Sequence, residues 1–174
     1  MGNTNRSRLR FNFGYMLEAE LGTSRTVEFE YPSVQANDVL LKPLDGHFMA
    51  TRVSEGVFIN GELYSHMPAE CMRCLETAVL PISIELDEMF YYPPSTAPEG
   101  ENVIGDDGFI ELTGLVRDLA ILALPLQPLC RSDCQGMCDQ CGFILNIRPC
   151  VCVTDDIDPR MAKLRELLRS KQES

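Results

Sequence analysis

Alternation of apolar and polar residues dominates the first half of the chain and predicts β-strands. The segment 26–31 places Val27 and Phe29 on one face and two glutamates on the other, which is typical of a half-buried strand. The same alternation recurs in later segments, and short connections with turn residues favour antiparallel hairpins. We therefore predict strands over residues 26–31, 39–54 (two strands bent at Asp45–Gly46), 57–63 and 78–90. In the last segment the alternation slips at Pro81, which predicts a bulge or a strand start there.

Helical periodicity replaces alternation in the second half of the chain. Residues 112–124 carry apolar side chains at the i, i+3, i+4, i+7 spacing of one buried face, and Pro125 ends the pattern. A second helix is predicted near the C-terminus, where Asp158 can cap the first turn and Pro159 fits the first helical position. The two apolar faces consist of Leu112, Leu115, Val116, Leu119, Leu122 and Ala123, and of Met161, Leu164, Leu167 and Leu168.

The order of these elements predicts the organisation of the chain. Residues 93–108 contain three prolines, three glycines and four acids, which is the composition of a surface loop or linker. We expect a β-rich part over residues 1–92, this acidic linker over 93–108, and a helix, a cysteine-rich knob and a C-terminal helix over 109–174, all within one compact domain. The fold class is α+β: a mainly antiparallel β-sheet with a packing helix, a cysteine-rich zinc knob and a C-terminal helix.

Composition and charge narrow the class of partner. The chain has 174 residues, of which 45% are apolar, and a net charge of −11. Residues 11–155 hold 22 acids and seven bases and so carry −15, which opposes binding to phosphate backbones. Direct RNA contact is therefore an open question. The arm with Arg6, Arg8 and Arg10 is the one place that suits it, although we favour the interpretation of this arm as a solvated tail. We expect a basic protein partner instead.

No segment of the sequence has the features of a membrane span or a secretory signal. The longest apolar run, Leu119–Leu126, is far shorter than the roughly 18 residues that cross a bilayer. The first residues contain arginines, but no apolar core follows them. We expect a cytoplasmic protein that does not enter membranes. In that compartment thiols stay reduced, so patterned cysteines indicate metal ligands or redox catalysts rather than disulfides.

Eight cysteines carry the candidate chemistry. Cys138 and Cys141 are separated by two residues, which lets both bind one metal ion from a single turn, and Gly142 allows that turn to be tight. Cys150 and Cys152 follow across a turn-forming stretch. Zinc takes four thiolates in a tetrahedron, so these four cysteines predict a zinc-ribbon-like site.

The remaining four cysteines leave several interpretations open. Cys71, Cys74, Cys130 and Cys134 would complete a second four-thiolate zinc site and use all eight cysteines. Cys71 and Cys74 are alternatively buried apolar thiols, or a redox pair of the thioredoxin type, although that pair is expected between a strand and a helix N-terminus. An iron–sulfur cluster also accepts four thiolates, but neither ferredoxin spacing is present.

Catalytic motifs are missing from the sequence. A catalytic zinc site keeps an open position and usually has histidine or carboxylate ligands. His47 and His66 are the two histidines of the chain, and both lie outside the cysteine-rich segment; we interpret them as surface residues, with His47 in a turn. The sequence contains no phosphate-binding loop, dinucleotide fingerprint or Ser-His-Asp order. We therefore expect that the protein is not an enzyme and takes no small-molecule substrate.

A set of motifs extends over most of the chain. Its segments are FNFGYMLEAELGTSRTVEFE (residues 11–30), Leu44–Gly46, Thr51–Gly56, Gly61, Glu70–Glu76, Pro125–Cys130, CRSDCQGMCDQCG (residues 130–142), Leu145–Asn146, Cys150, Cys152 and Asp158–Arg160. Together these segments resemble the bacterial YceD-type family of ribosomal RNA accumulation proteins. Asp139 departs from the resemblance, because the family often has proline there.

The resemblance implies a non-enzymatic factor for the synthesis, processing or stability of large-subunit (23S) ribosomal RNA. Ribosomal proteins and ribosome-assembly proteins are the basic partners that an acidic chain of this kind would meet. The alternative function is a thiol-based redox enzyme or sensor that uses Cys71 and Cys74. Metal content separates the two, since tightly bound zinc with unreactive thiols favours the first and a metal-free, low-pKa thiol favours the second.

Overall fold

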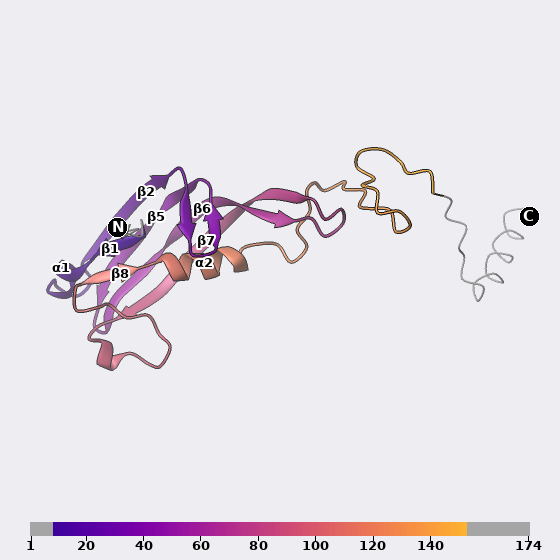
Figure 1. The fold of residues 1–174 in the computed structure, drawn as a ribbon. Helices are drawn as coiled ribbons and strands as arrows, with labels where there is room; N and C mark the ends of the chain where they lie inside the picture. The colour runs from indigo at the N-terminus through magenta and orange to yellow at the C-terminus, as the bar shows by residue number, and fades with distance from the viewer. Residues whose placement is uncertain (1–8, 153–174) are drawn as a thin grey trace, which may run out of the picture. The chain divides into compact units, whose positions relative to one another are not determined.

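The computed structural model describes residues 9–152 (Figure 1). Within these residues the chain forms two compact units: the first contains residues 9–72 and 76–132, and the second contains residues 73–75 and 133–152. The C-terminal helix predicted from Asp158 onward and the arginines at positions 6 and 8 lie outside the described residues. No helix in the described part of the chain has the length and apolar character needed to cross a membrane.

A four-stranded antiparallel sheet forms the body of the first unit (Figure 1). Its strand order is β2-β5-β6-β7, so consecutive long strands are joined as hairpins, as the short connections predict. The strands are β2 (Ser24–Tyr31), β5 (Leu44–Val53), β6 (Gly56–Glu70) and β7 (Thr77–Tyr91). The prediction of a mainly antiparallel β-sheet is confirmed.

Short elements surround the sheet. They are β1 (Arg10–Asn12) paired with β8 (Phe109–Glu111), β3 (Val34–Ala36) paired with β4 (Val39–Leu41), the helices α1 (Gly14–Leu17) and α2 (Thr113–Leu122), and a 3-10 turn (Pro94–Thr96). The sequence pattern does not predict β1, β3 or β8, because three residues are too few to show alternation. Helix α2 contacts β7 and β3.

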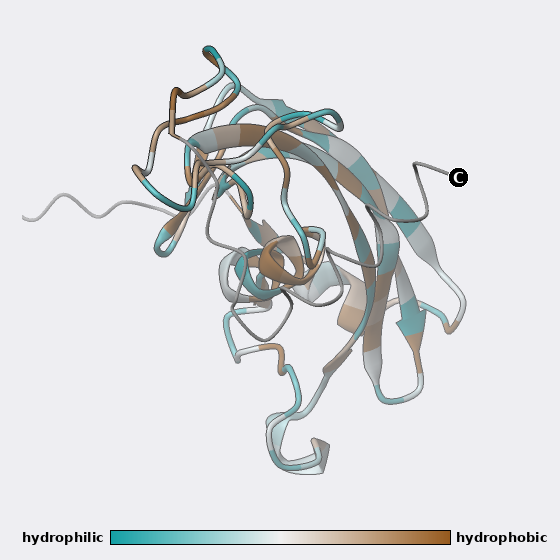
Figure 2. Cartoon of the chain, turned by 90° about the vertical axis from the view of Figure 1, so that its right-hand side faces the viewer, coloured by the Kyte–Doolittle hydropathy of each residue, from teal (hydrophilic) through white to brown (hydrophobic). Residues whose placement is uncertain are grey.

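The core of the first unit lies on one face of the sheet. Brown and teal segments alternate along the long strands in Figure 2, as expected when one face is apolar. The fully buried side chains include Phe13, Phe48, Ile59, Leu63, Ile84, Leu112 and Val116. Helix α2 covers this apolar face with Val116 and Ala120, so the predicted packing helix is present.

The break between β4 and β5 is not where the sequence suggests. We predicted a bend at Asp45–Gly46, but the break lies at Lys42–Pro43, and Gly46 pairs with Phe29 and Leu63 inside β5. A Cβ atom on Gly46 would lie 2.3 Å from the carbonyl oxygen of Glu62. This glycine is therefore required by close backbone packing rather than by a turn.

Two further details of the sequence prediction are wrong. β7 pairs with β6 in one unbroken register through Pro81, so there is no bulge or strand start there. The apparent slip arises because Val79 is 66% exposed and belongs to the outer face. In α2, Leu122 is 78% exposed although its spacing predicted a buried position. At 3.6 residues per turn, Leu122 lies about 120° around the helix from Val116, so it is off the face that Val116 and Ala120 bury.

The segment 93–108 is a loop with contacts to the first unit. Val103 forms a bridge with Tyr91, and Ile104 is fully buried while its N–H donates to the carbonyl oxygen of Tyr91 at 2.9 Å. At the far end, the carbonyl oxygen of Gly108 accepts the N–H of Phe13 at 2.9 Å. This segment, which the composition describes as a surface linker, thus supplies a core residue.

Candidate metal centres

The eight cysteines fall into two sets of four in the structure. The first cysteine set is Cys71, Cys74, Cys130 and Cys134, and the second cysteine set is Cys138, Cys141, Cys150 and Cys152. Within each set all four sulfur atoms lie within 4.8 Å of one another. Ligands at the corners of a four-thiolate zinc site lie about 3.8 Å apart, given a Zn–S distance of about 2.3 Å. The structure therefore brings together the same two groups that the spacing suggested.

Cys71 and Cys74 belong to the connection between β6 and β7. The connection is closed by the N–H of Cys71, which donates to the carbonyl oxygen of Glu76 at 2.9 Å. Leu75 adopts a left-handed backbone conformation (φ 61°), which reverses the chain within a few residues. Both thiols are buried, and neither lies at a helix N-terminus, where a thioredoxin-type pair would be expected.

A short hairpin in the second unit carries two ligands of the second cysteine set. Met137 bridges Ile144 in antiparallel pairing, and Cys138 donates its N–H to the carbonyl oxygen of Phe143 at 2.9 Å. The N–H of Gly142 donates back to the carbonyl oxygen of Cys138 at 2.9 Å. Gly142 has a φ of 69°, which a glycine adopts without strain. These contacts form the tight turn that the Cys138–Gly142 spacing predicts.

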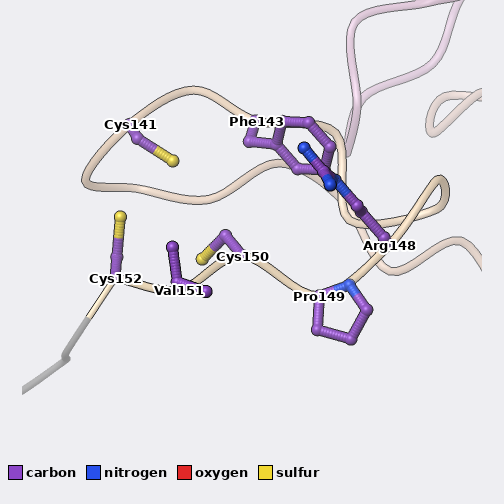
Figure 3. Close-up of a pocket in the computed structure, with 7 residues that line it drawn as sticks. All are labelled: Cys141, Phe143, Arg148, Pro149, Cys150, Val151 and Cys152. Carbon is purple, nitrogen blue, oxygen red and sulfur yellow. The ribbon is translucent and has the colours of Figure 1, made fainter.

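Cys150 and Cys152 complete the second set from a separate extended segment. The thiol of Cys150 donates to the sulfur of Cys138 at 3.4 Å. Figure 3 shows the sulfur atoms of Cys141, Cys150 and Cys152 directed toward a common space. Between Cys141 and Cys150 the chain packs the guanidinium of Arg148 against the ring of Phe143, 5.3 Å from its centroid.

The thiols of the second set influence one another's ionisation. Backbone N–H groups of Cys141 and Gln140 point at the sulfur of Cys138 and lower its pKa to about 7. A hydrogen bond with Cys141, burial and that neighbour's charge raise the pKa of Cys152 to about 12. The backbone N–H of Cys152 lowers the pKa of Cys150, but the hydrogen bond with Cys138, burial and the charge of Cys138 together outweigh it, so that the pKa of Cys150 is raised. A second negative charge is thus unfavourable without a cation among the sulfurs.

The donor atoms define what such a centre can do. Four thiolates would fill a tetrahedral zinc site and leave no position for water, so an ion held by either set would be a structural one. No histidine or carboxylate joins the groups of candidate ligands found among residues 9–152. His47 and His66 are exposed on β5 and β6, so His47 lies in a strand rather than in the predicted turn.

Three residues of the second unit support the cysteines and were not identified from the sequence. Arg73 donates from Nη1 to the carbonyl oxygen of Cys134 at 2.9 Å, and Gly136 (φ 77°) lies close to the backbone of Arg73. The side chain of Asn146 donates to the sulfur of Cys134 at 3.2 Å. In the sequence Asn146 has the features of an ordinary turn residue, so only its position in the fold reveals this contact.

Comparison with known proteins identifies the family of the chain. The family model described as the large ribosomal RNA subunit accumulation protein YceD matches residues 59–168, which include all eight cysteines. The chain belongs to the YceD family. The resemblance stated from the sequence motifs is confirmed.

Several relatives of the chain are proteins of bacteria and plants. A protein of Mycobacterium tuberculosis is 39% identical over 129 residues, which cover 72% of this chain and 62% of that relative. YlbN of Bacillus subtilis is 30% identical over 125 residues, covering 71% of this chain and 70% of YlbN. The chloroplastic large ribosomal RNA subunit accumulation protein YCED homolog 1 of Arabidopsis thaliana is 28% identical over 92 residues, or 51% of this chain and 25% of that protein.

The matches cover only part of each relative's length. The chain spans less than two thirds of the mycobacterial relatives that it matches. No solved structure matches the chain. The family is therefore established by sequence, and the described fold and the two cysteine sets supply the physical basis for a functional proposal.

Proposed function

We propose that this YceD family protein is a non-enzymatic, zinc-binding factor of the cytoplasm that supports the synthesis, processing or stability of large-subunit (23S) ribosomal RNA. The observation that carries the proposal is family membership, because the family description names accumulation of the large ribosomal RNA. The plant relative bears the same description. The protein acts in this role through protein partners that belong to the ribosome or to its assembly machinery.

Zinc is the metal that best suits the two cysteine sets. Thiolate ligands favour zinc over hard cations such as Mg²⁺ and Ca²⁺, and structural zinc sites commonly use four cysteines. Each set supplies four sulfurs within 4.8 Å of one another. The second unit has few buried apolar residues, so bound metal would contribute much of its folding free energy. We therefore propose one zinc ion for each set.

The chemistry of the described residues supports a non-enzymatic role. Both cysteine sets are closed donor sets, and neither places an acid or a base beside a position where a substrate could bind the metal. The alternative redox function would need a reactive thiolate at Cys71 or Cys74. Full burial of Cys71 and its place in a strand connection are unfavourable for such a nucleophile.

The charges on the outer face of the sheet support the proposal that the partner is a basic protein. The strand register aligns Glu28, His47, Glu62 and Glu85 in one row across β2, β5, β6 and β7. One flanking row contains Glu30, Asp45, Tyr64 and Ser83. The other flanking row contains Thr26, Met49, Asn60 and Asp87. Six of these twelve residues are acidic and none is Lys or Arg. The pKa of Tyr64 is raised by its hydrogen bond to Glu62, as expected in a field of negative charge.

This arrangement favours proteins over RNA as direct partners. Parallel rows of carboxylates repel phosphates and attract basic proteins, and they accelerate association most at low salt. Ribosomal proteins are basic because they bind RNA, so they suit such a surface. We propose that the sheet face contacts a partner of this kind, and that RNA is reached through it.

A deletion strain tests the proposed function. Precursor and mature large-subunit RNA are quantified in cells that lack the gene, together with ribosome profiles at several growth temperatures. We expect mature large-subunit RNA to fall while transcription of its precursor continues. Normal large-subunit levels at every temperature would contradict the proposal. Affinity capture of the tagged protein, with and without RNase, then distinguishes a protein partner from an RNA-mediated one.

A further inference from the structure

Asn146 lies in the segment between two ligands of one cysteine set but contacts a sulfur of the other. It follows Cys141 and precedes Cys150, both of the second set, whereas its side chain reaches Cys134 of the first set. We propose that Asn146 is a positioning residue for the sulfur of Cys134, so that the segment between Cys141 and Cys150 serves both candidate metal centres. This inference rests on the proposed binding of metal by the cysteines.

The hairpin of the second unit fixes where Asn146 lies. Met137 bridges Ile144, and the N–H of Leu145 donates to the carbonyl oxygen of Gly136 at 2.9 Å. The next pair in this antiparallel register is Gln135 with Asn146. Asn146 thus lies opposite Gln135, the residue that follows Cys134. This position is at the open end of the hairpin, away from the turn that contains Cys141.

A backbone contact determines which way the amide of Asn146 faces. The N–H of Gln135 donates to Oδ1 of Asn146 at 2.8 Å. Because a backbone N–H requires an acceptor, the oxygen must take this side and the NH₂ group must take the other. The NH₂ group then donates to the sulfur of Cys134 at 3.2 Å. The orientation of the donor therefore does not depend on the metal.

The environment of Cys134 makes this donor important. Its side chain is 2% exposed, so water cannot solvate the charge of a thiolate there. An amide N–H bonded to sulfur stabilises the thiolate form and restricts the direction of the ligand, which is the usual function of outer-sphere groups at metal sites. At Cys138 of the second set, backbone N–H groups have this function instead, and side-chain substitutions leave them in place.

Titration of the full chain with Co²⁺ tests the role of Asn146. The reduced, metal-stripped protein is titrated without oxygen in competition with a chelator, and the thiolate-to-cobalt absorption counts the equivalents. We expect two equivalents in the wild type, of which Cys74→Ser removes one and Cys141→Ser the other. In Asn146→Asp, the site that Cys74→Ser removes should bind Co²⁺ about tenfold to a hundredfold more weakly, because a carboxylate replaces the amide donor. The other equivalent should not change.

Matched variants complete the test. Gln135→Ala keeps the backbone N–H that orients Asn146, because the side chain that it removes donates to the carbonyl oxygen of Asp133 rather than to Asn146. Its two affinities should equal those of the wild type. Asn146→Ala removes the donor without adding charge, and the ¹¹³Cd resonance of one site should shift alone. The ¹¹³Cd measurement on Asn146→Ala also tests the proposal if Asn146→Asp does not yield folded protein.

The outcomes separate this inference from the proposed metal binding. A wild-type chain that takes up no Co²⁺ or Cd²⁺ would show that the cysteines are not metal ligands, and both ideas would fail. Two tight equivalents that Asn146→Asp leaves unchanged would overturn the role of Asn146 alone. Equal weakening of both equivalents, or shifts of both ¹¹³Cd resonances, would also overturn it, because Asn146 would then support the hairpin rather than Cys134.

Discussion

Arg117 of α2 holds Asp38 through two parallel hydrogen bonds. Its Nε donates to Oδ1 at 2.7 Å and its Nη2 donates to Oδ2 at 2.9 Å, so α2 is tied to the turn between β3 and β4. The hydrogen bond from Arg117 lowers the pKa of Asp38 from 3.8 to about 2. This geometry restricts both side chains, although Asp38 remains exposed to solvent.

Substitution of Asp38 should therefore have a pH-dependent effect on stability. A carboxyl whose pKa is lower in the folded state stabilises the fold above its unfolded pKa near 4, and this contribution disappears as the pH falls toward 2. We expect Asp38→Asn to lower the Tm slightly at pH 7, since exposed ion pairs contribute little.

Thermal unfolding of both proteins across pH 2 to 7 measures the difference. The two Tm values should converge at the acid end. Glu99→Gln, in the loop after β7, changes the net charge equally and serves as the control. A Tm difference that persists unchanged at pH 2 would contradict the assignment.

Gly46 should not tolerate a side chain. Its φ is 148°, and a Cβ atom would lie 2.3 Å from the carbonyl oxygen of Glu62 on the neighbouring strand. Gly46→Ala must separate β5 from β6 or strain the backbone, and we expect a loss of about 2 kcal/mol or more in the free energy of unfolding. Gly114→Ala in α2 meets no atom within 4 Å and should instead be neutral or slightly stabilising. Urea unfolding of the pair distinguishes these outcomes, and equal stabilities would be inconsistent with the packing.

Truncation of two apolar residues of α2 should have very different effects on stability, although the sequence pattern predicts that both are buried. Val116 is fully buried against the sheet, whereas Leu122 is 78% exposed. Truncation of Val116 to alanine should cost about 1 to 3 kcal/mol, through lost burial and a residual cavity. Leu122→Ala should change the free energy of unfolding by less than about 0.5 kcal/mol. A large effect at Leu122 would mean that another surface covers it in solution.

The contrast between Val116 and Leu122 shows which features of the fold the sequence pattern can predict. Helical spacing identifies the helix and the direction of its apolar face, but it cannot say how much of the helix circumference the rest of the first unit covers. Likewise, period-two alternation identified the long strands, while β1 and β8 are defined by pairing with each other across about a hundred residues, and β3 is too short to show alternation. The slip predicted at Pro81 has a related cause, because the exposed apolar residue Val79 interrupts the pattern without moving the strand.

The cysteines were easier to interpret than the residues that support them. Ligand spacing is a local property, so Cys138 and Cys141 indicate a turn around metal directly from the sequence. The contact of Asn146 with Cys134 depends instead on the register of a hairpin whose strands are too short for a pattern. Outer-sphere donors of this kind need the fold before they can be identified.

Removal of metal should affect the two units differently. The hairpin amides of Cys138, Gly142 and Leu145 donate to carbonyl oxygens of the same hairpin, which lacks a large apolar core of its own. If zinc holds this hairpin, a strong chelator should abolish hydrogen-exchange protection at these amides. The central strands of the sheet, with Phe48 and Ile59 fully buried, should stay protected.

Hydrogen exchange with and without chelator provides the measurement, and Cys138→Ser provides the matched variant. That variant should lose protection in the hairpin even without chelator, whereas a serine substitution at exposed Met137 should not. Unchanged protection of the hairpin amides after complete removal of metal would show that the second unit folds without zinc.

The acidic rows of the sheet should matter for function independently of the zinc sites. Glu28 and Glu85 occupy the outer strands of the row that crosses the sheet through His47 and Glu62. Reversal of both charges, Glu28→Lys with Glu85→Lys, leaves the core side of the strands intact. If a basic protein binds this face, the double variant should fail to restore mature large-subunit RNA in a deletion strain, because like charges now oppose the partner.

The control for this prediction reverses the same amount of charge elsewhere. Glu99→Lys with Glu101→Lys places both lysines in the loop after β7, so the net charge of the two double variants is identical. We expect the loop variant to restore the RNA and the sheet variant to fail, with equal Tm and equal zinc content. Equal restoration by both would exclude the sheet face as the binding surface. Equal failure would show that net charge governs the role, because the loop residues share no row with Glu28 or Glu85.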